Sequence, residues 1–410
     1  MKFLPSLSKI LILGLFLRLL WGLLIPVIPI SDSAAYDTFA INIWLHGTYG
    51  WEADAPYSYW PVGTSGLYSI IYSIFGHTYW PIVLLNCGFS LGIIYYTYTL
   101  AQIAFKSCDI ARLSALIIAI WPTGILFVTI LGSELPYMML SMAGIHFFFS
   151  SRKNIVLAGL LVGACFSLAY YVRPQVTVPF VICIFCAIVV MKDKVRIVAI
   201  KSLVCAALMI VAVTPWAIRN YNLHDAFVPM SSNGGAVFWM GNQPGSNGGY
   251  VPTPPSMADM DTNLRSQLLK QEALDYIKSE PFEFVSRTLY KFIKFHSYET
   301  IGVTWNQEGI TKTFGENWIT PLKIFTQGTW LIIVILGWGG LIFAIYKLGF
   351  WTIAFNPVTL FWASNAAIHS IIVSQDRYHI PSVPFISIYA AFVLMPLVTR
   401  YIKSAKLSLR

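Results

Sequence analysis

The feature that most constrains this chain is a series of apolar segments, each close to the length of a membrane-crossing helix. A span needs about 20 apolar residues. We identify candidates near residues 8–28, 80–104, 113–131, 135–150, 155–172, 175–191, 198–217, 328–346, 351–373 and 380–399. The sequence therefore predicts an all-α polytopic membrane protein with about ten transmembrane helices.

Composition and charge agree with a membrane protein. Hydrophobic residues make up 57% of the 410 residues and charged residues only 11%, against about 25% in a soluble globular domain. These figures exclude a disordered protein and a soluble nucleic-acid binder. The net charge is +9, and among the ends and short loops of the chain, Lys and Arg are concentrated at both ends and in alternate loops. This positive-inside pattern predicts that both termini are cytoplasmic.

The segments between the spans divide the chain into three parts. Residues 1–217 form an N-terminal transmembrane module, whose first outward loop covers residues 29–79. Residues 218–325 form a small outward domain of mixed structure, and residues 326–410 carry the last helices. Apolar spacing around residues 36–44 predicts a short helix on the membrane surface.

Three further outward segments have a recognisable pattern. Residues 64–76 are apolar but shorter than a span, which predicts an interfacial or re-entrant segment. The outward domain opens with Gly/Asn/Pro-rich turns and continues with a polar helix near 260–279. A basic amphipathic helix follows at 282–298.

Two acids stand where predicted spans meet the outward membrane surface. Asp32 follows the first span, with Tyr36 one helical turn later, and Glu134 follows the third span. Each can belong to a helix cap, formed by Ser31 or Asp32 in one case and by Ser133 in the other. Acidic groups so close to lipid are costly and usually mark a site or a paired charge, so Asp32 is also a candidate general base or metal ligand.

Three arginines, Arg173, Arg219 and Arg377, each stand at the outward mouth of a predicted span. One such arginine can be a snorkelling anchor. Three at one depth instead indicate a pocket for an anionic headgroup, because a guanidinium matches phosphate oxygens bidentately. Trp and Tyr also cluster in 36–80 and 216–250. Interfacial belts explain most of these rings, but a sugar-stacking face would draw on the same residues.

Several other kinds of function have no support in the sequence. The histidines lack metal-binding spacings such as HExxH, and no phosphate-binding loop or serine-hydrolase elbow occurs. Nucleotide-driven pumping and serine-hydrolase chemistry are therefore not indicated. No internal repeat is visible, which weakens an inverted-repeat transporter.

The order of several short motifs is similar to that of a known family. The motifs are DSAAY at 32–36, YWPVGTSGLYSIIYSIFG at 59–76, SE at 133–134, AGLLVGACFSLAYYVRP at 158–174, PWAIRNY at 215–221 with FVPMSSNGG and GNQPG, and RYHIP at 377–381. In this order they resemble bacterial GT-C membrane glycosyltransferases, family 39-like, the group of protein O-mannosyltransferases and aminoarabinose transferases. The resemblance implies a GT-C fold and the use of polyprenyl-phosphate sugars in the bacterial cytoplasmic membrane.

The resemblance also implies roles for individual residues. In that family the acid of the first loop is the catalytic carboxylate and an acid opening the fourth helix assists it, which points to Asp32 and Glu134. Many relatives have Asp-Glu and an Arg before the Tyr, where this chain has Ser33 and Ala35, so a usual phosphate contact is missing. We place the contacts to donor phosphate and substrate at Arg173, Arg219, Arg377, Tyr36, Tyr59 and Asn220.

The sequence establishes no cofactor. Some relatives place an acidic metal ligand where this chain has Tyr59, which argues against a bound cation. A divalent cation stays open, with Asp54 as the candidate oxygen ligand.

The sequence thus predicts an inverting glycosyltransferase. It would move a sugar from a polyprenyl-phosphate donor to an envelope acceptor, lipopolysaccharide or another glycan rather than a protein, on the outer face of the membrane. The alternative is a transporter or flippase of a polyprenyl-linked glycan, which would use the same arginines without chemistry. A transporter needs polar groups near the middle of the bilayer, whereas most acids and arginines here lie at one edge.

Overall fold

The computed structural model describes residues 4–150 and 154–408, and within these ranges the chain forms helices and no strand. Residues 1–3, 151–153 and 409–410 carry several of the basic residues behind the topology prediction and lie outside the described residues. The α-helices are α1 (Leu7–Leu24), α2 (Asp32–His46), α3 (Gly63–Phe75), α4 (Trp80–Phe105), α5 (Cys108–Ile120), α6 (Pro122–Leu126), α7 (Glu134–Ser150), α8 (Ile155–Val172), α9 (Thr177–Phe185), α10 (Val195–His224), α11 (Gly234–Met240), α12 (Thr262–Ser279), α13 (Pro281–Ser297), α14 (Ile301–Thr304), α15 (Gln307–Phe314), α16 (Ile319–Leu348), α17 (Phe350–Ala354), α18 (Pro357–Ile371) and α19 (Val383–Ser408).

Six helical segments of the described chain are long and apolar enough to cross a membrane: Leu7–Leu24, Trp80–Phe105, Ile155–Val172, Val195–His224, Glu316–Leu348 and Ile380–Val398. The bent pair α5 and α6 adds a seventh if it is counted as one span. The chain is therefore a multi-pass membrane protein. The predicted spans at 135–150, 175–191 and 351–373 correspond to shorter or broken helices, so the count of ten stays a prediction.

A buried arginine explains how the bend between α5 and α6 is tolerated. The two helices meet at 58°, and Pro122 has no N–H to donate to the carbonyl of Ile118. Arg18 of α1 is fully buried and donates to the carbonyl oxygens of Ile118 at 3.2 Å and Ala119 at 2.8 Å. Because unpaired carbonyls are costly in the apolar interior, Arg18 stabilises the broken span.

The last two long helices pack very closely. In α16, a Cβ on Gly340 would lie 1.9 Å from the carbonyl oxygen of Tyr389 in α19. Only glycine permits this backbone approach, and small residues serve this purpose at many membrane helix interfaces. This close packing fixes the position of α19, and so of the loop between α18 and α19 that carries Arg377.

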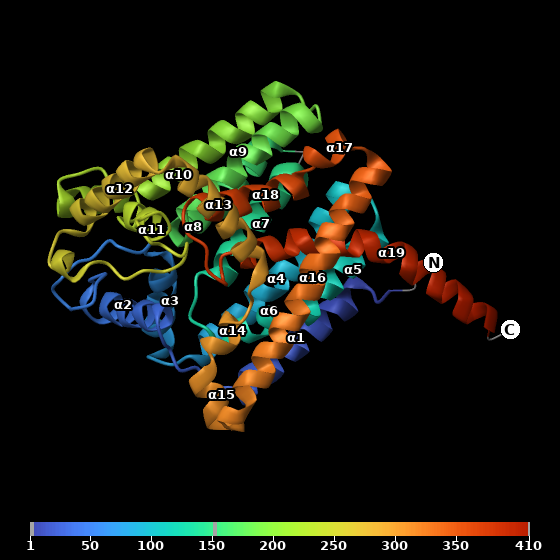
Figure 1. Ribbon diagram of the computed structural model, residues 1–410, viewed down its shortest axis with the longest axis horizontal. Helices are drawn as coiled ribbons and strands as arrows, with labels where there is room; N and C mark the ends of the chain where they lie inside the picture. The colour runs from blue at the N-terminus through green and yellow to red at the C-terminus, as the bar shows by residue number, and fades with distance from the viewer. Residues whose placement is uncertain (1–3, 151–153, 409–410) are drawn as a thin grey trace.

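The predicted interfacial segments are both helical. They form α2 and α3, which pack against each other. The start of α3 lies against the end of α8, where a Cβ on Gly63 would meet the backbone of Tyr171 at 2.5 Å. In Figure 1 these two helices lie on the left with α11 and α12, whereas the start of α1 and the end of α19 lie on the right.

The predicted outward domain is helical rather than mixed. Its described residues include α11 to α15 and no strand. Helix α11 itself lies within the Gly/Asn/Pro-rich stretch, and most of the rest of that stretch forms turns and loops. The predicted polar and amphipathic helices are confirmed as α12 and α13. Ser266 of α12 accepts hydrogen bonds from the backbone N–H of Gly235 at 2.9 Å and of Ala236 at 3.2 Å, which fixes α11 on α12.

Candidate functional site

Five of the residues that the sequence predicts for the site line one large cavity. Its volume is about 1010 Å³, and its walls come from α2, the loop before α3, the end of α8, α11, α12 and the loop between α18 and α19. The lining includes a set of residues that the sequence singles out: Asp32, Tyr36, Tyr59, Arg173 and Arg377.

At this cavity an ion pair joins two residues that are far apart in the sequence, Asp32 and Arg377. Asp32 is the first residue of α2, and its Oδ2 accepts a 2.6 Å hydrogen bond from Nη2 of Arg377. Ser31 just before it has φ 53°, a left-handed conformation that is costly for serine and often found at functional sites. The helix cap expected here does not form through a side chain of Ser31. The carboxylate of Asp32 instead faces the guanidinium group.

Arg377 is held by aromatic rings as well as by charge. Its guanidinium lies 4.8 Å from the ring of Trp305 and 5.4 Å from that of Tyr378. Burial alone would lower the pKa of Arg377, but the negative charge of Asp32, together with smaller effects of Tyr378, Glu134 and Tyr36, raises this pKa well above its ordinary value. Arg377 therefore carries a permanent positive charge. Its Nε is buried and has no hydrogen-bond partner in the described residues.

Glu134 links the second arginine to the first. Its Oε1 accepts a 2.5 Å hydrogen bond from Arg173 and lies 3.9 Å from Nη1 of Arg377. Arg173 also donates to Oγ of Ser133 at 2.8 and 2.9 Å. Glu134 opens α7, where the helix dipole favours an acid. It is fully buried and does not line the cavity, so it supports the two arginines from behind.

Tyr36 and Tyr59 stand on the cavity wall as neutral groups. Burial, with the negative charge of Asp32, raises the pKa of Tyr36. Burial likewise raises the pKa of Tyr59, which packs edge-to-face on Trp60 at 5.1 Å. Both hydroxyls therefore keep their protons and can donate hydrogen bonds to a bound ligand.

Arg219 and Asn220 lie outside the cavity lining and hold its walls instead. Arg219 stacks on Trp216 at 4.7 Å and donates to the carbonyl oxygen of Tyr57 at 2.8 Å. Asn220 is fully buried and donates to the carbonyl oxygens of Val228 at 3.0 Å and Met230 at 3.1 Å. Both residues thus fix the loops whose other side chains face the cavity.

The acids near the cavity do not fit a divalent cation. Asp32 and Glu134 are engaged by guanidinium groups, and Asp54 is exposed and outside the lining. Within the described chain, no three His, Cys, Asp or Glu side chains are close enough to share a metal ion. Carboxylate oxygens free to bind a hard cation are what such a site would need.

One buried network was not predicted from the sequence. Glu299 and His379 are both fully buried, and Nε2 of His379 lies 2.9 Å from Oε2 of Glu299. The other oxygen of Glu299 accepts hydrogen bonds from Trp121 at 2.8 Å and Thr123 at 2.7 Å. The available signal was the position of His379 two residues after Arg377 in the RYHIP motif. The network ties the loop of Arg377 to α6.

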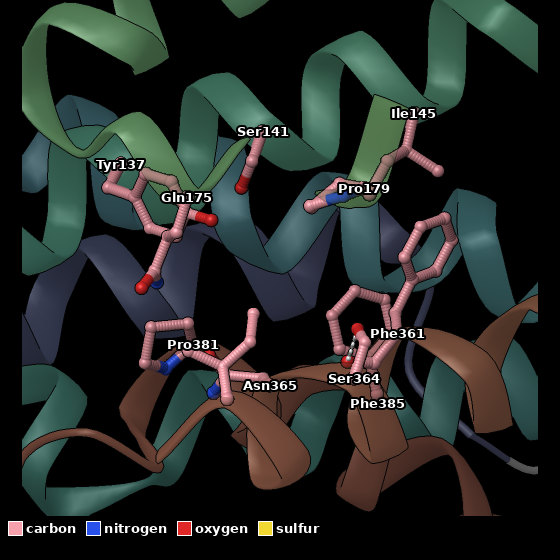
Figure 2. Close-up of a pocket in the computed structure, with 11 residues that line it drawn as sticks. Tyr137, Ser141, Ile145, Gln175, Pro179, Phe361, Ser364, Asn365, Pro381 and Phe385 are labelled. Atoms are coloured by element: carbon pink, nitrogen blue, oxygen red, sulfur yellow. Dashed lines mark hydrogen bonds between the residues drawn. The ribbon is translucent and has the colours of Figure 1, made fainter. Parts of the chain in front are cut away.

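A second, much smaller cavity lies beside the large one. Its volume is about 30 Å³, enough for a water molecule but not for a sugar. Figure 2 shows Tyr137 and Gln175 on one wall with Asn365 and Pro381 across from them. Asn365 donates to the carbonyl oxygen of Tyr378 at 3.1 Å, so this wall also supports the loop of Arg377.

Comparison with known proteins gives matches in structure alone. No protein-family model matches the sequence, and neither does any curated protein. The archaeal oligosaccharyltransferase AglB from Archaeoglobus fulgidus, solved with an inhibitory peptide and a dolichol-phosphate, matches with a TM-score of 0.59 and 12% identity over 98% of this chain and 51% of its own. ArnT from Cupriavidus metallidurans bound to undecaprenyl phosphate matches with a TM-score of 0.58 and 13% identity over 94% of this chain and 59% of its own.

The matched structures are larger than this chain, which spans about half to three-fifths of their length. Both are glycosyltransferases with the GT-C fold. At such low identity the likeness concerns the backbone arrangement, and it extends over nearly all of this chain. The chain therefore has the GT-C fold of these integral-membrane glycosyltransferases.

Proposed function

We propose that this protein is an inverting glycosyltransferase of the bacterial cytoplasmic membrane. It takes a sugar from a polyprenyl-phosphate donor and transfers it to an envelope acceptor, a lipopolysaccharide or another glycan rather than a protein. The cavity faces the outer side of the membrane, and both termini are cytoplasmic. The fold supports this proposal, because AglB and ArnT were solved with dolichol-phosphate and undecaprenyl phosphate.

The observation that carries the proposal is the pairing of Asp32 with Arg377 on the wall of a cavity large enough to hold a sugar. Glycosyl transfer needs a base for the acceptor hydroxyl and a positive charge for the departing phosphate. Asp32 and Arg377 supply one of each at hydrogen-bond distance. Glu134 lies behind the cavity wall, where it binds Arg173 and stands 3.9 Å from Arg377.

The reaction follows from these positions. Asp32 accepts the proton of the acceptor hydroxyl while the acceptor oxygen forms a bond to the anomeric carbon of the donor sugar. The bond between that carbon and the phosphate oxygen breaks, and the polyprenyl phosphate leaves with its electron pair. Its negative charge lies at the membrane surface, where low dielectric strengthens attraction to a guanidinium.

Arg377 is the arginine best suited to the donor phosphate. It lines the cavity, and its Nε has no hydrogen-bond partner in the described residues. Arg173 also lines the cavity but already donates to Ser133 and Glu134. Arg219 is turned away toward backbone carbonyls. Arg377 thus takes the role of the arginine that is missing at Ala35.

A flippase would use the same cavity without a base. Such a protein needs polar groups along the bilayer interior to guide a headgroup. Arg18, the buried arginine of the first span, is fully occupied by Ser90 and by backbone carbonyls. This occupation favours the enzyme over the transporter.

The decisive experiment incubates purified protein with labelled polyprenyl-phosphate sugars and membranes, followed by identification of the labelled product. We expect label in an envelope glycan or lipid and release of polyprenyl phosphate in equal amount. Movement of intact labelled donor across vesicle bilayers, without any new glycosidic bond, would establish the flippase instead.

A further inference from the structure

The large cavity has a second positively charged wall, away from the pair of Asp32 and Arg377. Arg265 lies in the first turn of α12 and is only 8% exposed, yet it lines the cavity. Its Nη1 donates to the carbonyl oxygens of Met257 and Ala258, both at 3.2 Å. Its Nε is buried without a hydrogen-bond partner in the described chain.

The charge of Arg265 differs from that of the other arginines in the lining. Arg173 and Arg377 each have a carboxylate partner, Glu134 and Asp32 respectively. Among the described residues no carboxylate lies within ion-pair distance of Arg265. A buried guanidinium held only by neutral carbonyls retains strong attraction for an anion, because burial without a counter-charge is costly. The cavity therefore has one unbalanced positive charge, located at Arg265.

An aromatic ring lies beside this charge, and further rings line the same cavity. The guanidinium carbon of Arg265 lies 6.0 Å from the centre of the Tyr59 ring, and Tyr59 packs near Tyr57 at 6.2 Å. Tyr250, an exposed ring, also lines the cavity. Flat aromatic surfaces with a few fixed polar groups are typical walls for a ligand that has both an apolar face and polar edges. A sugar ring is such a ligand.

The two charged walls belong to one continuous site. Tyr59, beside Arg265, and Tyr378, beside Arg377, pack against the same apolar cluster, which includes Trp239. Both tyrosines line the cavity. A ligand held at Arg265 therefore extends toward Asp32 within the same space.

We propose that Arg265, with Tyr59 and Tyr250, forms a subsite for an anionic sugar of the acceptor. This proposal rests on the proposed function and adds the acceptor's chemical class, a glycan that carries a carboxylate or a phosphate close to the accepting hydroxyl. The guanidinium binds the anionic group, and the tyrosine rings cover a face of the sugar.

Binding of simple probes tests the subsite without any transfer reaction. We would measure the affinity of purified full-length protein for methyl glucuronoside, glucose 6-phosphate and neutral methyl glucoside by ligand-observed NMR titration. One charge-assisted hydrogen-bonded contact is worth about tenfold or more in affinity. We therefore expect at least one of the two acidic probes to bind about tenfold more tightly than the neutral sugar. Comparison of the two identifies carboxylate or phosphate as the natural group.

Substitutions assign the preference to Arg265. Arg265→Gln should abolish the preference for acidic probes, and Arg265→Lys should keep part of it, which guards against a loss caused by misfolding. Lys278→Gln is the matched control, because Lys278 lies on the same helix and is exposed, with an ion-pair partner, Asp275, that does not line the cavity.

Two results would overturn the subsite. One is equal affinity of the wild-type protein for acidic and neutral probes, even when sugar transfer is observed. The other concerns a soluble prenyl phosphate. If it displaces the acidic probes and also binds the Arg265→Gln variant more weakly than the wild type, Arg265 belongs to the donor site. An acid preference without transfer from any donor would instead contradict the proposed function and leave the subsite standing.

Discussion

Arg377 donates a 2.6 Å hydrogen bond to Asp32 although 345 positions separate them in the chain. Asp32 follows the first span, α1, and Arg377 precedes the last, α19. The pair therefore forms only when the N-terminal and C-terminal helices have packed together. Two features support this long-range contact, namely the close approach of α16 and α19 at Gly340 and the buried bond between Glu299 and His379.

Asp32→Asn should reduce sugar transfer by about 10² to 10⁴, because loss of a positioned base typically costs this much in rate. The amide oxygen of the variant can still accept the hydrogen bond of Arg377, so the melting temperature should change little. Transfer of labelled sugar measures the effect. Asp54→Asn removes an exposed acid of the same loop and serves as the control. Near wild-type transfer by the Asp32→Asn variant would show that the base lies elsewhere.

The sequence predicted which residues gather at the cavity better than it predicted which way they point. Arg219 stands at the mouth of its span like Arg377, but its orientation depends on how Trp216 and the 57–60 loop pack. Such packing is a property of the whole fold, and one span does not determine it. The predicted positions of Asp32 and Glu134 were more reliable, because each opens a helix at a recognisable boundary.

Contacts between residues far apart in the sequence could not be predicted either, because they also depend on the packing of the whole fold. The bend at Pro122 is visible in sequence as a proline within an apolar run. Its compensation by Arg18 is not visible, because Arg18 lies about 100 positions away from the carbonyls of Ile118 and Ala119. The partners of Glu299 are similarly distant, at 178 positions for Trp121 and 80 for His379.

Arg377→Gln should weaken donor binding and also lower turnover by about 10² to 10³, because in the proposed mechanism the guanidinium contacts the phosphate before and during its departure. Arg219→Gln should leave donor affinity nearly unchanged and lower the melting temperature, since Arg219 binds the backbone of Tyr57. Equilibrium binding of labelled polyprenyl phosphate, together with thermal unfolding in detergent, separates the two effects. The opposite pattern, with donor binding lost only in Arg219→Gln, would move the phosphate site.

Removal of the Glu299 side chain should strongly destabilise the protein. In Glu299→Ala the buried groups of Trp121, Thr123 and His379 lose their acceptor. Breaking a buried polar set by removing one partner costs about 3 kcal/mol or more. His379→Gln should cost less, because its amide can donate to Glu299 in place of the imidazole. Thermal unfolding in detergent measures both, and an unchanged melting temperature for Glu299→Ala would contradict the role of this network.

Lys291 should make stability depend on pH. It is fully buried in α13 and donates to carbonyl oxygens of Ile371 at 2.8 Å and Ile372 at 3.2 Å. Burial, with a smaller effect of Arg287, lowers the pKa of Lys291 to about 7 from 10.5. Between these values the unfolded chain binds the extra proton, so the free energy of unfolding rises with pH, by at most about 1.4 kcal/mol per pH unit.

The contribution of Lys291 can be isolated by comparison with Lys291→Met. Other groups titrate in the same range, but they are shared by both proteins. The difference in melting temperature between wild type and variant should therefore shift in favour of the wild type from pH 7 to pH 9, a range that begins at about the folded pKa. A difference that is constant over this range would show that Lys291 stays protonated in the folded protein.

Transfer should invert the configuration at the anomeric carbon. Retention would need one carboxylate to attack the sugar while a second, about 5 Å away in the glycosidase analogy, acts as acid and base. Glu134 is the nearest candidate for that second group, but it is fully buried, bound to Arg173 and absent from the cavity lining. In the proposed mechanism Asp32 is thus left to activate the acceptor, and Arg377 helps the phosphate to depart. NMR of the product should show the anomeric configuration opposite to that of the donor, and mass spectrometry of the protein during turnover should detect no sugar bound to Asp32. Retained configuration, or a trapped glycosyl ester on Asp32, would make Asp32 a nucleophile instead of a base.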